Sequence, residues 1–79
     1  MKKRSSFDVQ LKILKTIYEN QGITMTSLER KIRTNPASLR EHCEHLDFFE
    51  LLHIKKEPTT QKIYLTKEGE NIVRKIQDT

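Results

Sequence analysis

The chain has 79 residues, of which 34% are apolar, and a formal charge of +4. Its length allows one domain, and its low apolar content predicts a thin core that self-association would stabilise. It holds no apolar run that could span a membrane, no apolar region of a signal peptide, and one cysteine, which excludes an intramolecular disulfide. We therefore expect a soluble, cytoplasmic protein, and its positive charge favours a polyanionic partner.

Residues 1–5 predict a flexible basic arm, and residues 6–79 predict a single folded domain. This domain begins with a helix predicted from Ser6 to Asn20. Ser6 can cap its N-terminus, and apolar residues recur along it at helical spacing, which gives the helix one face for a core. Gly22 can adopt the left-handed backbone conformation that commonly follows the last turn of a helix.

A short strand and a second helix are predicted next. Residues 23–25 have high β propensity and could add a third strand to a later hairpin. The run Thr26-Ser27-Leu28-Glu29 matches a capping box, which predicts a helix that starts at Thr26 or Ser27 and ends near Arg33. Only Thr34-Asn35 separates this two-turn helix from the next predicted helix, a spacing typical of a helix-turn-helix.

The third helix is the predicted recognition helix. Asn35-Pro36 is a strong start signal, because asparagine caps well and proline gives up an N–H that has no partner there, so we expect a helix that ends near Phe48. Leu39, Cys43 and Leu46 mark its buried face. The residues that we expect to contact DNA lie on the opposite face, on its borders and in the preceding turn: Arg33, Thr34, Asn35, Ala37, Ser38, Arg40, Glu41 and His45.

A basic β-hairpin, which we call the wing, is predicted behind this helix. Its strands are Leu51–Lys56 and Lys62–Thr66, joined by a polar tip, and a last helix follows Thr66 and ends near Asp78. The predicted fold is α+β and mostly helical, a winged helix-turn-helix in the order helix, strand, two helices, two strands, helix. The wing residues that we expect to contact DNA are Lys55, Lys56, Thr59, Thr60, Gln61 and Lys62.

The predicted recognition helix is the most acidic part of this basic protein. Residues 35–50 hold one arginine and four acids, a net charge of −3. Acids at every third position spiral around a helix, so we expect Asp47 and Glu50 to turn toward the body of the protein, which leaves Glu41 and Glu44 to repel phosphates. The N-terminal end of the helix would then enter the major groove, and its second half would stay clear of DNA.

Three segments resemble a known group of proteins: residues 39–46, the Leu51-Leu52 pair, and the run Ile63-Tyr64-Leu65-Thr66-Lys67-Glu68-Gly69. They resemble the small archaeal winged-helix regulators, including the archaeal chromatin-associated winged-helix proteins, and more distantly the MarR-type repressors. The resemblance extends from about Leu11 to Ile76. It implies a winged helix-turn-helix, binding of double-stranded DNA and usually a homodimer.

Two departures from these relatives matter. Related sequences tend to place glycine where this chain has Glu50, and a left-handed backbone there would strain this residue by ~1 kcal/mol relative to glycine. The alternative is that the helix ends differently, at Phe48-Phe49. The chromatin-like relatives dimerise through a long C-terminal coiled coil, whereas the last helix predicted here has about eleven residues, too few for three heptads. A homodimer should therefore use the first helix, the last helix or both, with candidate contacts at Phe7, Tyr18, Phe48 and Phe49.

The leading interpretation is a DNA-binding transcriptional regulator with sequence-specific or semi-specific recognition, without enzymatic activity or a cofactor. His42, Cys43, His45 and His53 suggest a metal site, but no Cys-x-x-Cys or His-x-x-x-His spacing is present, so we expect none. The alternative is a winged-helix module that binds protein and has little affinity for DNA. The acidic third helix is the best support for that alternative.

Overall fold

The computed structural model describes residues 6–77, with side chains over residues 8–76, so the predicted basic arm at residues 1–5 and the side chain of Phe7 lie outside the described residues. Helices and strands follow the order expected from the sequence. They are α1 (Ser6–Glu19), β1 (Ile23–Thr24), α2 (Met25–Lys31), α3 (Pro36–Phe48), β2 (Leu52–Lys56), β3 (Gln61–Leu65) and α4 (Lys67–Gln77). None of the described helices is both long and apolar enough to cross a membrane.

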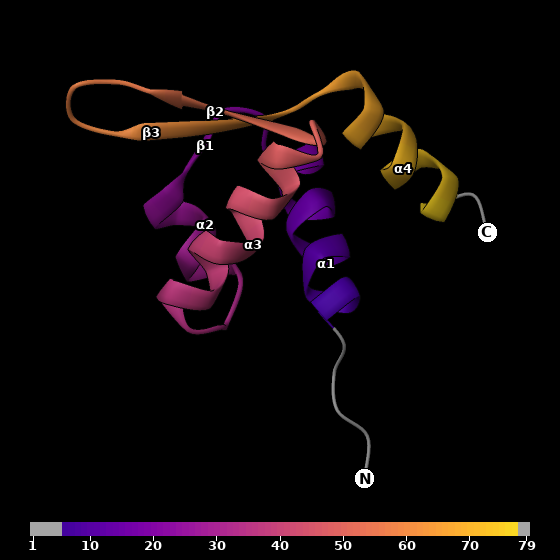
Figure 1. The fold of residues 1–79 in the computed structure, drawn as a ribbon, viewed down its shortest axis with the longest axis horizontal. Coiled ribbons are helices and arrows are strands. Elements are labelled where there is room, and N and C mark those ends of the chain that lie inside the picture. The colour runs from indigo at the N-terminus through magenta and orange to yellow at the C-terminus, as the bar shows by residue number, and fades with distance from the viewer. Residues whose placement is uncertain (1–5, 78–79) are drawn as a thin grey trace, which may run out of the picture.

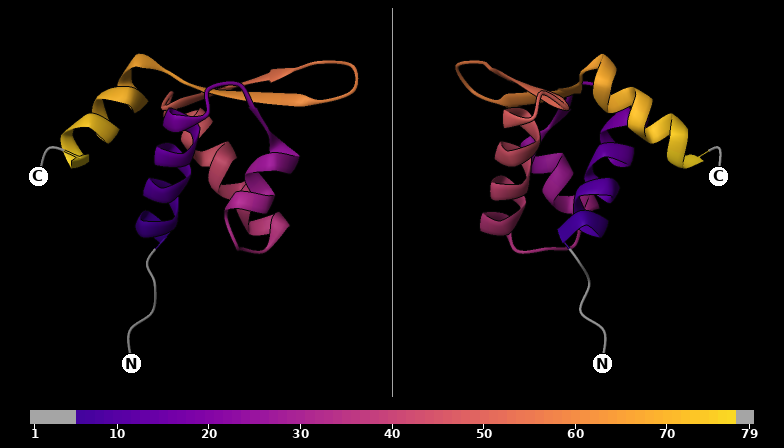
Figure 2. Two further views of the ribbon diagram at one scale, coloured as in Figure 1. Left: turned by 180° about the vertical axis from the view of Figure 1, so that it is seen from behind. Right: turned by 45° about the vertical axis from the view of Figure 1, so that its right-hand side comes forward.

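The strands form one antiparallel sheet in the order β1-β3-β2, which confirms that residues 23 and 24 add a third strand to the hairpin. In this sheet Ile23 pairs with Ile63, and Leu52 pairs with Leu65. Helices α1, α2 and α3 lie below the sheet, and α4 packs against α1 (Figure 1). The wing, made of β2, β3 and their turn, projects on the side of α2 and α3, and α4 lies on the other side of α1 (Figures 1 and 2).

The core lies between the helices and the sheet. Every helix except the last contributes two or more buried apolar side chains, and α4 contributes Val73. Leu39, Cys43 and Leu46 are at most 2% exposed, which confirms the predicted buried face of α3. No polar or charged side chain in the described part of the chain is buried, so apolar contact is the main source of stability.

The start of α2 differs from its prediction. Thr24 is the N-cap, and its Oγ1 accepts a hydrogen bond of 3.1 Å from the backbone N–H of Ser27. The capping box predicted at Thr26-Ser27-Leu28-Glu29 is therefore wrong. Pairing of β1 with β3 holds Thr24 in the extended conformation that an N-cap requires, and the helix starts directly after it.

The end of α3 resolves one open alternative and corrects one expectation. Glu50 has a φ of 61°, the left-handed conformation that glycine would adopt without strain. This reversal lets the Leu51 N–H donate to the carbonyl oxygen of Leu46. Asp47 and Glu50 do not turn toward the body of the protein, since both are exposed. The sheet and helices cover only a narrow stripe of α3, and these acids lie outside it.

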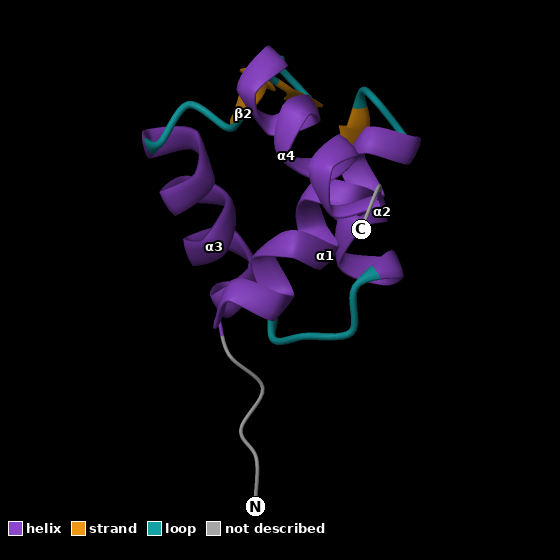
Figure 3. Ribbon diagram, turned by 90° about the vertical axis from the view of Figure 1, so that its right-hand side faces the viewer, coloured by secondary structure: helices purple, strands orange, loops and turns teal. Residues whose placement is uncertain are grey.

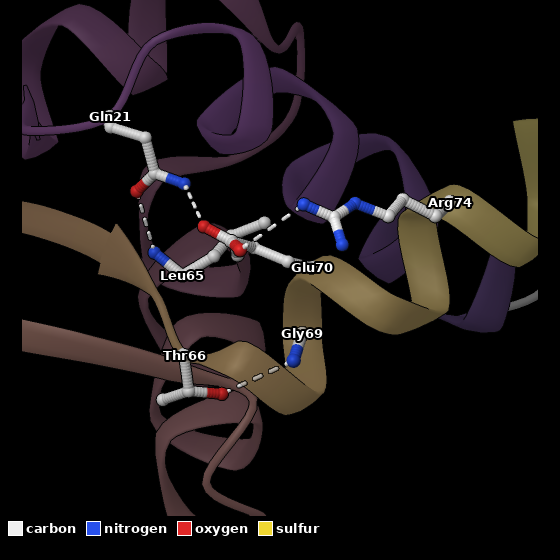
Figure 4. A network of polar contacts seen from close by, with 6 residues as sticks. All are labelled: Gln21, Leu65, Thr66, Gly69, Glu70 and Arg74. Atoms are coloured by element: carbon white, nitrogen blue, oxygen red, sulfur yellow. Dashed lines mark hydrogen bonds and ion pairs between the residues drawn. The ribbon is translucent and has the colours of Figure 1, made fainter.

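The start of α4 explains the Tyr-x-Leu-Thr-x-x-Gly run. Thr66 Oγ1 accepts a hydrogen bond of 3.2 Å from the Gly69 N–H (Figure 4). The same hydroxyl donates a hydrogen bond of 2.6 Å to the carbonyl oxygen of Glu50. The Thr66 N–H donates to the carbonyl oxygen of Leu51. A Cβ on Gly69 would overlap that same oxygen, so only glycine allows this close approach. Threonine and glycine together fasten α4 to the junction between α3 and β2.

A second polar link joins α4 to the turn after α1. Gln21 donates from Nε2 to a Glu70 carboxylate oxygen at 3.2 Å and accepts at Oε1 from the Leu65 N–H at 3.0 Å (Figure 4). Glu70 also lies 3.9 Å from the guanidinium of Arg74. This network fixes α4 relative to the base of the wing.

Candidate nucleic-acid interface

The N-terminal end of α3 is exposed and rigidly capped. Asn35 Oδ1 accepts a hydrogen bond of 2.8 Å from the Ala37 N–H, and the Asn35 carbonyl oxygen accepts one from the Leu39 N–H. Pro36 occupies the first helical position, as predicted. Among the predicted DNA contacts of this region, Thr34 and Ser38 are half-buried; those that are exposed are Arg33, Asn35, Ala37, Arg40, Glu41 and His45.

The tip of the wing is a tight turn. The N–H of Glu57 donates to the carbonyl oxygen of Thr60 at 2.8 Å, and the N–H of Thr60 donates back at 3.3 Å, which leaves Pro58 and Thr59 at the apex. Neither apex residue has a positive φ, which fits a type I turn with proline at its second position. Thr59 is exposed and Thr60 half-buried at the far end of this hairpin.

Strand alternation divides the predicted wing contacts between two faces. Ile63 is buried against the helices, so its cross-strand partner Ile54 and the next pair on that face, Lys56 with Gln61, point to the helical side. Lys55 and Lys62 are cross-strand partners on the opposite face. The sequence prediction treated the three lysines as one group, and the structure separates them.

Glu57 lies between the two lysines on that opposite face. Its carboxylate oxygens are 3.9 Å from Lys55 Nζ and 3.9 Å from Lys62 Nζ. Like charges directly across two strands repel each other, and a carboxylate between them offsets that repulsion. Part of the positive charge of the wing is therefore already neutralised by a carboxylate of the same chain.

A hollow of about 480 Å³ lies between the wing and α3. It brings Arg40 of α3 together with four predicted wing residues: Lys56, Thr59, Thr60 and Gln61. Within residues 6–77, neither Arg40 nor Lys56 has an ion-pair partner. The other predicted helix residues, which do not line the hollow, are Ala37, Ser38, Glu41 and His45.

Three acids also line this hollow: Glu44, which the sequence analysis expected to face phosphates, and Asp47 and Glu29, which it did not. Glu44 and Asp47 follow Arg40 at steps of four and three residues on one face of α3, and Glu29 comes from α2. The helical spacing of Arg40, Glu44 and Asp47 was a usable signal. These acids outnumber the two cations, so the floor of the hollow repels phosphate and its rims hold the groups that could bind it.

His42 and Cys43, two of the residues that suggested a metal site, have contacts within the fold. The side chain of Gln10 on α1 lies 3.3 Å, Nε2 to Nδ1, from His42 on α3. Burial, with a smaller effect of Glu44, raises the pKa of the Cys43 thiol to about 11, so the thiol stays protonated at neutral pH. In the part of the chain that the structure describes, no three side chains of His, Cys, Asp or Glu are placed to hold a metal ion.

No protein-family model matches the sequence, and no curated protein is significantly similar to it. Its fold, however, matches solved structures. AF1382 from Archaeoglobus fulgidus has a TM-score of 0.82 and 20% identity over 90% of this chain and 82% of that one. MarR has a TM-score of 0.82 and 19% identity over 90% of this chain and 54% of that one.

A third match is FabT from Streptococcus pneumoniae, whose structure is a complex with DNA. It has a TM-score of 0.81 and 12% identity, over 87% of this chain and 50% of that one. The chain thus spans most of AF1382 and about half the length of MarR and FabT. These similarities show that the fold is the winged helix-turn-helix of MarR-like proteins.

Proposed function

We propose that this protein binds double-stranded DNA as a transcriptional regulator, with the N-terminal end of α3 in the major groove and the wing on the flanking backbone. The observation that carries the proposal is the shared hollow, because Arg40 and the wing tip border one concave surface. The FabT structure contains DNA, which supports this use of the fold. No catalytic role is part of the proposal.

The residues divide into two roles by chemistry. Ser38, Arg40 and Glu41 lie in the first turns of α3 and would read base edges, since arginine can pair with guanine and glutamate can accept from the cytosine amino group. Ala37 leaves room for close approach, and His45 borders the same face. Phosphate contacts would come from the turn and the wing: Arg33, Thr34, Asn35, Lys55, Lys56, Thr59, Thr60, Gln61 and Lys62.

The acids in the hollow restrict how DNA would sit. Glu44 and Asp47 would face the duplex from the second half of α3 if the backbone entered the hollow. We infer that the wing tip on one rim contacts phosphates, that Arg40 on the other rim reaches base edges, and that the DNA bridges over the acidic floor.

The experiment is a salt titration of binding to a random duplex and to a duplex from the region upstream of its own gene, followed by fluorescence anisotropy. Log K should fall by roughly 0.9 per phosphate contact for each decade of salt. Replacement of Lys55 and Lys56 by alanine should weaken binding to both duplexes equally, whereas Arg40→Ala should reduce the preference between them. Affinity that does not change with salt would refute the proposal.

The acids of the hollow favour a second candidate, a module that binds a basic protein. In that case no duplex would be shifted in a gel, and charge reversal of Glu44 and Asp47 would abolish partner binding. For either function we propose that a second copy of the chain associates through α1, α4 or both. Sedimentation equilibrium over a range of protein concentrations tests this part separately.

A further inference from the structure

The most exposed large apolar side chains among the described residues stand together at the end of α3. Phe48 is 80% exposed and Phe49 is 66% exposed. Their rings meet edge to face, with centroids 5.4 Å apart. The chain reversal at Glu50 returns Leu51 to the protein but leaves both rings outside. Exposed apolar patches of this kind on small domains often mark contact surfaces.

The charge around this aromatic pair, Phe48-Phe49, excludes DNA as its ligand. Glu44, Asp47 and Glu50 are exposed beside it. The sequence holds no lysine or arginine between Glu41 and Lys55. Phosphates would be repelled here, so the surface that covers the pair must be apolar and basic.

A surface with those two properties exists on the same protein, in a groove between α1 and α4. Leu11, Val73 and Ile76 line it, Lys12 and Lys15 flank it, and its volume is about 190 Å³. This volume is below that of pockets for drug-sized ligands, yet it can accept an aromatic side chain. Ile76 is 44% exposed in it. The groove and the aromatic pair are both apolar. The lysines beside the groove and the acids beside the pair have opposite charges.

The pair does not fill the groove of its own chain, because both rings remain exposed to solvent. In Figure 3, α3 lies to one side of α1 and α4, although its end is hydrogen-bonded to Thr66, the residue that precedes α4. We infer that the Phe48-Phe49 pair of one copy docks into the α1–α4 groove of a second copy, where Asp47 and Glu50 face Lys12 and Lys15. The inference rests on the proposed self-association through α1 and α4, and it does not require DNA binding.

The size of this contact sets its strength. An aromatic side chain buries ~150–250 Å², and two of them with their rim reach less than the ~1,200–2,000 Å² of a stable interface. The contact should therefore be weak in dilute solution. It would become populated at high protein concentration or when adjacent sites on one DNA hold two copies together.

Nuclear magnetic resonance without DNA can test the contact. The labelled receptor is the ¹⁵N Phe48→Ser/Phe49→Ser variant, which keeps the groove and lacks the pair. Unlabelled wild-type protein is added to about 1 mM, the range in which a weak contact is populated. We expect concentration-dependent shifts of the amides that line the groove: Leu11, Lys12, Lys15, Val73 and Ile76.

Two matched controls make the result decisive. Unlabelled Phe48→Ser/Phe49→Ser protein, added in place of wild type, should cause no shifts. A labelled receptor that also carries Lys12→Glu and Lys15→Glu should lose most of the response. All these changes are on exposed side chains, and a well-dispersed amide spectrum verifies folding.

The inference is overturned if the groove amides do not shift, if the shifts occur mainly elsewhere, or if the donor without phenylalanines causes the same shifts. Because the titration contains no DNA, it is independent of the anisotropy experiment. Sedimentation that shows a dimer unaffected by Phe48→Ser/Phe49→Ser would support association through α1 and α4 and overturn the aromatic contact alone.

Discussion

Replacement of Glu57 by glutamine should strengthen DNA binding and lower the free energy of unfolding. The Glu57 carboxylate lies 3.9 Å from Lys55 Nζ and 3.9 Å from Lys62 Nζ, and both lysines are proposed phosphate contacts. A phosphate that approaches either lysine must compete with this carboxylate. Glutamine keeps the size of the side chain and removes the charge, so the variant isolates the competition.

The distances set the size of the effect. Two unit charges at ~4 Å attract by about 1 kcal/mol in water, and measured exposed pairs contribute ~0.2–1 kcal/mol. Affinity should rise by up to about five-fold, the equivalent of about 1 kcal/mol. The free energy of unfolding should fall by about 0.5 kcal/mol, because Lys55 and Lys62 then repel each other across the strands.

Fluorescence anisotropy with a random duplex measures the affinity, and urea denaturation measures the stability. Glu68→Gln is the control, because it changes the net charge equally but lies in the first turn of α4, away from the wing. The gain for Glu57→Gln should shrink as salt rises, since exposed charges are screened. If this variant binds DNA more weakly than wild type, Glu57 serves to position the lysines and the competition argument is wrong.

Three further predictions concern stability. Gly69→Ala should lower the free energy of unfolding, measured by urea denaturation, by about 3 kcal/mol, because the added Cβ would overlap the Leu51 carbonyl oxygen. A loss under about 1 kcal/mol would show that the backbone at this junction moves easily. Glu50→Gly should raise the free energy of unfolding by about 1 kcal/mol by relief of a positive φ; the reasoning fails if thermal melts show no gain. Wild type should lose stability relative to Cys43→Ala between pH of about 9 and 11, because the raised pKa of the buried thiol means that the unfolded state loses its proton first; parallel pH profiles of the two proteins in urea denaturation would contradict this.

The sequence predicted well wherever one local pattern determined the structure. Leu39, Cys43 and Leu46 recur at helical spacing, and burial of all three follows from that period. Two short apolar and basic runs joined by a polar tip predicted the hairpin, and Asn35-Pro36 predicted the start of α3 correctly. Gly69 was noticed only through the resemblance, and the structure adds its physical reason.

The errors came from features that depend on tertiary contacts. Thr24 and Thr26 are both plausible caps in the sequence, and pairing of β1 with β3 selects Thr24. The angle between the wing and α3 decides that Asp47 faces a hollow, and no local pattern encodes that angle. The division of Lys55 and Lys56 between two faces follows from strand alternation, which the sequence argument did not apply to the proposed lysine contacts.

The fastening of α4 has a mechanical consequence. Thr66 and Gly69 hold the first turn of α4 against main-chain atoms at the end of α3. A movement of α4 is therefore transmitted to α3. A torque applied to α4 by a neighbouring molecule would tilt α3 rather than dissipate in a flexible joint. A molecule that binds α4 could therefore change how deeply α3 enters the major groove of DNA.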